Sequence, residues 1–558
     1  MKLKRTLAIL LAAAMITASL AACGSSDSGQ SDGGSSTPSS TDSGSSDSGN
    51  TDSSTPADSG SSTGSDHLNV VMQFDATLST VADSYSGCWF PMRMGYSEAL
   101  TKVASDGSIT SWLASDWEMS DDARTWVFTI RDDVCFSNGT PLTATKVVDA
   151  INHLYDYNDP ANGGPDALVN FMVRPASIVA DDAAYTVTFT FDDPVYNVAG
   201  ALSNPAFGII DWEASADMDY ATQGEIGTGP YVVASTVAGH SVEMVANEYY
   251  YEDVPYATVT ILSMADSSAM SYALQDGSAD MACNLSMSDI TNLEGIGGYE
   301  CHTAYGARDG FYFINFNGIM SNDDVRHAVL MAVDWETIDN ITVGGSYIPG
   351  FAMISPVYGN YGSASIDNPW AYDPAGAIAL LDAAGIVDSD GDGIREVDGE
   401  NVQIVIATNS SRQMDIMADA MVPMIQEVGL GAVHNLVEDQ TEPLSSGACD
   451  LANWNQVIMQ TGDPSNFLRQ WVSDSSNNYG HYSNPEYDAL YAQLISMQAD
   501  SEEAYEIVKQ MQTIIAEDGA FDNAGYFVFN LCNSVNITGV VCNGTADYYW
   551  ITNDIMPA

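Results

Sequence analysis

The histidines and serines of this sequence do not form the motifs of a hydrolase. Residues 67–558 contain no Gly-x-Ser-x-Gly sequence, the turn that exposes a nucleophilic serine. No histidine belongs to a His-Glu-x-x-His sequence that could hold a catalytic zinc ion. The seven histidines are His67, His153, His240, His302, His327, His434 and His481. A secreted hydrolase is therefore the less favoured interpretation, and we expect a binding protein and not an enzyme.

A short acidic run has part of the pattern of a calcium loop. Asp388, Asp390 and Asp392 place oxygens at positions one, three and five of a loop that begins like an EF-hand. Position twelve is Gly399, where an EF-hand needs a bidentate glutamate. A loose calcium turn and an acidic surface hairpin stay open as alternatives. The hairpin is favoured, so we expect no metal site and no cofactor.

Cys23 has the surroundings of a lipid attachment site. Positive charges on Lys2, Lys4 and Arg5 precede an apolar stretch, Leu7 to Leu20, that is short for a membrane span. The sequence Leu-Ala-Ala-Cys-Gly that ends at residue 24 looks like a bacterial lipobox. We therefore expect residues 1–22 to be a signal peptide and Cys23 to carry a lipid on the outer face of the cell membrane. An ordinary signal peptide with an incidental cysteine is the alternative.

The other cysteines do not indicate a metal site or a disulfide scaffold. Their number is odd and no pair has Cys-x-x-Cys spacing. Cys532 and Cys542 are close enough in sequence to pair outside the cell, although isolated thiols would give the same pattern. The seven are Cys88, Cys135, Cys283, Cys301, Cys449, Cys532 and Cys542.

Composition separates a linker from a folded body. Residues 24–66 are almost entirely Ser, Gly, Asp, Thr and Pro, with no aromatic residue, Lys or Arg, so residues 23–66 are expected to be a disordered, lipid-bearing linker. The net charge of −60 excludes nucleic acid and anionic membrane surfaces as main partners. Contact with the membrane is expected only through the lipid. The acidity itself fits either a cationic ligand or a well-solvated surface, and it does not identify the ligand.

The body combines strand and helix patterns along its whole length. Thr125–Ile130 and Tyr185–Phe191 alternate large apolar residues with smaller or polar ones, which predicts half-buried strands. Helical spacing predicts a helix over Ala144–Leu154, and a second between the cap Asp373 and the stop Gly385. Asn484-Pro485 and Asp500-Ser501 start two further amphipathic helices. Interleaved elements without a repeat favour α/β lobes.

Several longer motifs occur in a family-like order. They are Leu113–Glu118, Phe136–Ala144, Gly227–Tyr231, Val325–Asp334, Tyr372–Gly385, Gly462–Pro464 and Asn484–Asp488. Together they resemble the family 5 extracellular solute-binding proteins, which include the dipeptide- and oligopeptide-binding proteins. One departure is Trp335, because the family usually carries Arg at this position.

The resemblance implies an α/β fold, a type II periplasmic-binding-protein-like clamshell of two lobes with an extra domain. Lobe I is then expected from residues 67–101, 227–315 and 526–558, the extra domain from 102–226 and lobe II from 316–525. The implied function is capture of a small solute, a peptide, for the permease and ATPase subunits of an ABC importer, by a monomer whose lobes close on the ligand. An oligosaccharide, a metal chelate or a sensor role is the alternative.

A buried peptide site needs a carboxylate for the ligand's ammonium and a cation for its carboxylate. In peptide-binding relatives an aspartate stands three residues before the pair matched by Asp463-Pro464, but here that residue is Gln460, a weaker partner for an ammonium. Asp463 could take this role, or serve only as a turn residue. Arg412 follows a strand expected at Val402–Ala407 and stands where dipeptide binders carry an arginine. A surface Arg paired with an acid is the alternative.

Three aromatic residues complete the predicted site. Trp454 corresponds to the family's cleft tryptophan, with a longer spacing to Asp463 than expected. Tyr85 and Trp89 are candidates to line the cleft, and packing in the core is the alternative role for both.

Overall fold

The computed structural model describes residues 66–73, 78–83, 87–361 and 366–558, and its contacts group Thr63–Ala558 into one compact unit. Residues 1–65 lie outside these ranges, and so do Cys23, with its predicted lipid, and Tyr85.

The main sheet has eleven strands and combines parallel with antiparallel pairs. In spatial order its strands are β17 (Gly431–Leu436), β16 (Gln403–Thr408), β18 (Leu451–Val457), β12 (Tyr299–Ile314), β19 (Asp522–Ser534), β11 (Met281–Cys283), β1 (His67–Met72), β10 (Thr258–Ser263), β9 (Ser241–Ala246) and β8 (Tyr231–Val237), and β13 (Tyr347–Ile348) pairs with β19.

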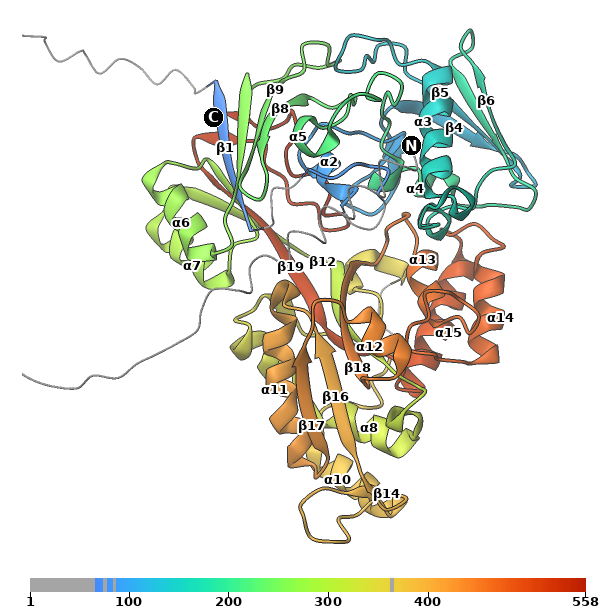
Figure 1. Ribbon diagram of the computed structural model, residues 1–558, viewed down its shortest axis with the longest axis vertical. Coiled ribbons are helices and arrows are strands. Elements are labelled where there is room, and N and C mark those ends of the chain that lie inside the picture. Colours follow the sequence, from blue (N-terminus) through green and yellow to red (C-terminus); the bar gives the residue numbers. More distant parts are fainter. Residues whose placement is uncertain (1–65, 74–77, 84–86, 362–365) are drawn as a thin grey trace, which may run out of the picture. The chain divides into compact units, whose positions relative to one another are not determined.

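The two longest strands, β12 and β19, connect two groups of shorter strands (Figure 1). On one side, which we call lobe I, β19 pairs with β11 and continues to β1 and β8–β10. On the other side, lobe II, residues 308–314 of β12 pair with β18. The β12–β19 register shifts between Tyr305 and Asp309, which marks a bulge where the strands pass from one side to the other.

A separate four-stranded sheet lies within residues 102–226. Its strand order is β4 (Ala114–Met119), β5 (Thr125–Ile130), β7 (Thr186–Thr190) and β6 (Ser177–Asp181). Trp126, Phe128 and Ile130 alternate inward along β5 and share a core with α3 (Ala144–Asn158). The two predicted strands and the predicted helix of this region are confirmed.

Helices cover the lobe II strands, and their ends follow the predicted caps. Asp373 caps α10 (Pro374–Ala384) by accepting from the Gly376 amide, and Gly385 ends it in the left-handed region. Asn484 caps α14 (Pro485–Leu494), and Ser501 caps α15 (Glu502–Glu517). These helix predictions are confirmed. Within the described ranges, no helix combines the length and apolar character needed to cross a membrane.

The other α-helices and the small hairpins have the following bounds. The helices are α2 (Trp89–Arg93), α4 (Val198–Ala201), α5 (Tyr220–Gln223), α6 (Ser267–Asp276), α7 (Met287–Ile296), α8 (Asp323–Ala332), α9 (Trp335–Thr337), α11 (Met414–Glu427), α12 (Thr441–Ser446) and α13 (Ser465–Leu468), and the small hairpins pair β2 (Thr101–Val103) with β3 (Ile109–Ser111), β14 (Glu396–Val397) with β15 (Glu400–Asn401), and β20 (Ile537–Thr538) with β21 (Met556–Pro557).

The disulfide differs from the pairing considered from the sequence. Cys532 joins Cys301, which lies directly opposite it in the β12–β19 ladder, and Cys542 is a free thiol. Two cysteines 231 residues apart become neighbours only because these strands pair. Sequence proximity, which left a Cys532–Cys542 pair and isolated thiols open, therefore did not reveal the partner of Cys532.

Candidate functional site

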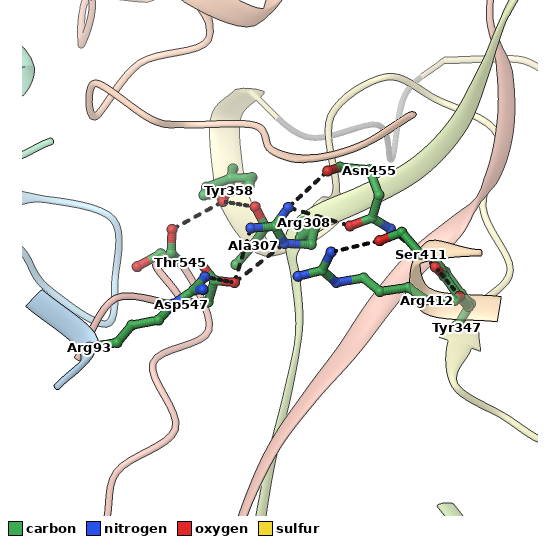
Figure 2. Close-up of polar contacts among 10 residues, drawn as sticks. All are labelled: Arg93, Ala307, Arg308, Tyr347, Tyr358, Ser411, Arg412, Asn455, Thr545 and Asp547. Atoms are coloured by element: carbon green, nitrogen blue, oxygen red, sulfur yellow. Dashed lines mark hydrogen bonds and ion pairs between the residues drawn. The ribbon is translucent and has the colours of Figure 1, made fainter. Parts of the chain in front are cut away.

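Three arginines from distant parts of the chain converge around one carboxylate, that of Asp547 (Figure 2). Arg93 is the last residue of α2, and its Nη2 lies 2.9 Å from Asp547 Oδ2. Arg308 approaches the same oxygen with its Nη2 at 3.2 Å. Arg412 lies on the lobe II side, and its guanidinium points toward the other two. We call these four residues the arginine cluster.

The bulge in β12 positions Arg308. Gly306 has φ +87°, and an added Cβ would lie 2.1 Å from Ser355 Oγ, so this turn of the strand requires glycine. Two residues on, Arg308 Nη1 donates to the Asn455 carbonyl of β18 at 2.9 Å. Arg308 therefore contacts both lobe II and Asp547 from the strand that joins the lobes.

Arg412 is held by an unusual backbone. It follows β16, which begins and ends one residue later than the strand predicted at Val402–Ala407. Arg412 has φ +52° in the 3₁₀ turn Ser411–Gln413. The Tyr347 hydroxyl donates to the Arg412 carbonyl at 2.9 Å, which fixes this turn. Left-handed conformations of residues other than glycine are costly and concentrate at functional sites.

The electrostatics of the arginine cluster leave an excess of positive charge. Burial alone would raise the pKa of Asp547, but Arg308, Arg93 and Arg412 hold that pKa below its ordinary value. Burial and the like charge of Arg308 lower the pKa of Arg412 to about 9, so Arg412 remains cationic at neutral pH. One carboxylate thus faces three guanidiniums in a protein whose net charge is −60. Such an arrangement is suited to an anionic group of a ligand.

The arginine cluster opens into a cavity of about 460 Å³ between the two sides, which we call the interlobe cavity. This size is in the usual range for small-molecule sites. Aromatic rings form much of its wall, including Phe171, Tyr479 and Tyr548. Trp454 also lines it and stacks on Tyr479, with ring centroids 5.1 Å apart. The interlobe cavity can therefore hold a carboxylate at one end and apolar groups along its walls.

The sequence pattern of the bacterial extracellular solute-binding proteins, family 5 Middle, matches residues 108–479. The chain belongs to this family. Members of family 5 act outside the cytoplasm, bind peptides or other small solutes and work with ABC permeases.

Two family 5 relatives show different ligands at similar sequence distances. The nickel-binding periplasmic protein of Escherichia coli is 27% identical over 60% of this chain and 64% of its own length. The oligopeptide-binding protein AppA of Bacillus subtilis is 25% identical over 81% of this chain and 84% of its own. The family therefore leaves the ligand undetermined.

Solved family 5 structures confirm the predicted fold, a two-lobed periplasmic-binding fold. The structure of AppA with a nonapeptide has a TM-score of 0.73 at 22% identity and covers 88% of this chain and 99% of its own. NikA from Brucella suis, solved with Fe(III)-EDTA, has a TM-score of 0.76 at 21% identity and covers 88% of this chain and 100% of its own. The predicted residue boundaries of the lobes and extra domain stay a prediction.

Four predicted family 5 site residues line the interlobe cavity: Trp89, Arg412, Trp454 and Gln460. Asp463 does not. It lines an adjoining cavity of about 430 Å³, where it is bonded to the Asn197 side chain and the Ser465 amide. The two cavities share Asn170, Phe171 and Asn466 as lining residues.

Sequence reasoning missed Arg93, Arg308 and Asp547. The only available signal was scarcity, because the sequence has 15 Lys and Arg residues and any of them is a candidate for an anion site. Arg93 and Asp547 are 454 residues apart, and no local pattern reveals that they pair.

The acidic run keeps the character of a surface turn. Asp388, Asp390 and Asp392 are exposed, and their carboxylates approach within 4.8 Å of one another. Asp388 accepts from the Gly391 and Gly393 amides, and Asp390 from the Asp392 amide. These hydrogen bonds tie the carboxylates to the backbone of their own turn, and the absence of a metal site here stays a prediction.

Proposed function

We propose that this protein is the substrate-binding subunit of an ABC importer and that it captures a solute bearing a free carboxylate, specifically a peptide with a free C-terminus. The arginine cluster is the observation that carries this proposal. Arg93 is 2% and Arg308 12% exposed, so the excess positive charge has little solvent to screen it. A carboxylate that enters the interlobe cavity would offset the excess charge and accept charge-assisted hydrogen bonds.

The apolar walls support a peptide over a simple organic acid. Trp89, Trp454 and Tyr479 offer ring faces and edges to side chains of different sizes, and such surfaces contribute area without strict shape selection. The adjoining cavity, with Asp463 in its wall, shares lining residues with the interlobe cavity and is proposed to receive further residues of a longer peptide. Gln460 and Asp463 are the groups closest in sequence to the ammonium partner of peptide-binding relatives, and each is proposed as a contact for the peptide's amino end.

The remaining parts of the proposal concern where and how the protein acts. Cys23 is proposed to carry the lipid that tethers a monomer to the outer face of the membrane, with residues 1–22 removed. The permease and ATPase of the importer are the proposed partners, and no catalytic step is required of the protein. A sensor that uses the same site is the alternative to uptake.

A metal chelate is the second candidate ligand. The relative named for nickel binding and the Fe(III)-EDTA complex of NikA are the comparisons that favour it. Chelators such as histidine or EDTA carry carboxylates that the arginine cluster would hold equally well. No histidine is among the described residues that line the interlobe cavity, so the chelator would have to bring the metal ligands itself.

A thermal-shift screen of the mature protein tests the proposed function. Di-, tri- and longer peptides are compared with oligosaccharides and with nickel in the presence of L-histidine. A ligand that binds only the folded state raises the free energy of unfolding, by about 2.7 kcal/mol at a hundredfold excess over Kd. The melting temperature rises accordingly. We expect the peptides to give the shifts. If no peptide changes the melting temperature, and nickel with histidine or a sugar raises it, the peptide assignment is rejected.

A further inference from the structure

Lobe II contains a second cavity that is separate from the arginine cluster. Its volume is about 490 Å³, and it shares no lining residue with the interlobe cavity. Its walls are drawn from residues 330–336, 349–353, 368–372 and 512–523. We call it the lobe II cavity.

Aromatic rings held by other contacts line the lobe II cavity. Trp335 stacks on Tyr312, with ring centroids 5.8 Å apart at 27°. Trp370 stacks on His327 at 3.6 Å, and its Nε1 donates to the Ala516 carbonyl at 3.0 Å. The other rings are Phe351, Tyr372 and Phe521. The cavity therefore presents preorganised ring surfaces that favour a cation or an apolar group.

The charged residues of the lobe II cavity are all acidic. Asp334, Glu336 and Asp522 line it, and none of its described lining residues is Lys, Arg or His. Asp334 already accepts from the Thr337 amide and hydroxyl, at 3.0 and 2.7 Å. The Asp522 carboxylate differs because the residue is only 4% exposed and Oδ1 has one donor, Trp335 Nε1, at 2.8 Å.

The second oxygen of Asp522 has no donor. Asp522 Oδ2 is buried and has no hydrogen-bond partner among the residues that the structure describes. A buried carboxylate that lacks a partner costs free energy, and a cation that donates a hydrogen bond to it would remove that cost. A neutral apolar ligand would leave Oδ2 unpaired, and three carboxylates would repel an anion.

We propose that the lobe II cavity binds a small primary ammonium ion with an apolar or aromatic body, whose nitrogen donates to Asp522 Oδ2 once this carboxylate turns toward the cavity and whose body packs against Trp335 and Trp370. This site is independent of the proposed transport function, because it shares no residue with the interlobe cavity. It would be a second ligand site on the same protein.

Calorimetric titration of the full mature protein with benzylammonium, with benzyl alcohol as the neutral isostere, tests this proposal. We expect benzylammonium to bind at least tenfold more tightly than benzyl alcohol. Asp522→Asn keeps the shape of the side chain but removes its charge, and should weaken benzylammonium at least tenfold. Arg412→Ala is the matched control in the interlobe cavity and should leave this affinity within twofold.

The pH dependence gives a second readout that needs no variant. Burial raises the pKa of Asp522 to about 7, against the opposing hydrogen bond from Trp335. Asp522 therefore gains a proton as the pH falls from 8 to 6, and benzylammonium should bind about tenfold more weakly at pH 6. Of the groups around it, burial raises the pKa of Tyr312, so Tyr312 stays neutral in this range, and burial together with Arg326 lowers the pKa of His327, while Asp334 and Glu336 face the cavity from α9 and its cap.

Trp335→Arg provides a further variant if Asp522→Asn does not fold. A guanidinium at this position would occupy the charge site beside Asp522, so benzylammonium binding should be lost. Equal affinity for benzylammonium and benzyl alcohol, an affinity that does not change between pH 6 and 8, or unchanged binding by Trp335→Arg or a folded Asp522→Asn would each overturn the proposal.

Discussion

Asp547 is the one carboxylate of the arginine cluster and lies among its three guanidiniums. It accepts from Arg93 and Arg308, and three nearby guanidiniums keep its pKa below the ordinary value despite its burial. The charge of Asp547 is therefore the main element that stabilises the unliganded arginine cluster. Removing it would leave the three cations close together with no compensating carboxylate.

We predict that Asp547→Asn lowers the free energy of unfolding of the unliganded protein by about 3 kcal/mol, since it breaks a buried ion pair from one side. Urea denaturation at neutral pH measures this loss. Asp133→Asn is the matched control, because Asp133 also pairs with an arginine at 2.8 Å but is 56% exposed. An exposed pair contributes about 0–1 kcal/mol, so equally small losses in both variants would contradict the account of the arginine cluster.

The site could be predicted from sequence only in part, and the reason lies in these residues. Arg412, Trp454 and Gln460 were located by motifs that sit close to them in the chain. Arg308 and Asp547 approach each other only through the β12 bulge and the C-terminal segment. Their pairing depends on tertiary structure, and periodicity and capping rules describe only local sequence.

Among the elements, the π-helical turn beside β19 carries a buried aspartate, Asp339, that has no compensating charge or hydrogen bond among the described residues. Asp339 belongs to the π-helical turn Ile338–Thr342 and is fully buried, with neither carboxylate oxygen hydrogen-bonded among the described residues. A Cβ added to Gly525 of β19 would lie 2.8 Å from its Oδ2, which shows how closely the two elements approach. Burial raises the pKa of Asp339 to about 8.

We predict that Asp339→Asn stabilises the protein at high pH. Because the folded-state pKa is raised, folding binds a proton, and stability falls as the pH rises from about 4 toward 8. The variant should match the wild type near pH 4 and exceed it by roughly 5 kcal/mol at pH 8, since each pKa unit corresponds to about 1.4 kcal/mol. Urea denaturation across this range measures the difference. A variant that is less stable at pH 8 would show that Asp339 is charged and partnered.

The Cys301–Cys532 disulfide fixes β12 against β19 on the lobe I side. It closes a long loop, so reduction should cost about 2–5 kcal/mol of stability. We predict that a mild reductant lowers the melting temperature of the wild type. The double variant Cys301→Ser/Cys532→Ser should start at the lower temperature and not respond to the reductant. A response of equal size in both proteins would assign the effect to another thiol.

Elements with local signals were predictable, and those set by long-range pairing were not. Asp373, Pro374 and Gly385 determine the ends of α10 within one short segment, and the alternation over Thr125–Ile130 identifies β5 directly. The sixteen-residue strand β12 pairs with segments at least 137 residues away, so its length and bulge had no local signal. The long separation of Cys301 and Cys532 likewise explains why the sequence left the disulfide partner of Cys532 open.

At the scale of the whole molecule, polar contacts join the two sides of the interlobe cavity. Asn477 Nδ2 donates to Asn170 Oδ1 at 3.2 Å, Asn204 Nδ2 to the Gln460 carbonyl at 3.1 Å and Asn197 Nδ2 to the Thr461 carbonyl at 2.8 Å. Residues 170, 197 and 204 come from the predicted extra domain, and their partners from lobe II. We infer that these bonds favour the closed arrangement that holds a ligand.

We predict that Asn477→Ala weakens ligand binding about threefold to tenfold, the effect of about one hydrogen bond, with little change in the melting temperature of the unliganded protein. Calorimetry with the best peptide from the screen and a thermal melt measure the two quantities. Asn162→Ala is the control, because Asn162 bonds within its own domain, to the Asp156 carbonyl. Equal affinity in the two variants would remove the interlobe contact from the closing mechanism.

In the proposed function the arginine cluster binds the free carboxylate of a peptide, and calorimetric comparison of the best peptide with its C-terminal amide tests this claim. The wild type and the control Arg131→Ala should bind the free acid at least tenfold more tightly than the amide, since the amide loses charge-assisted hydrogen bonds. In Arg412→Ala this preference should shrink to about threefold or less. Equal affinities of the acid and the amide for the wild type would contradict the claim.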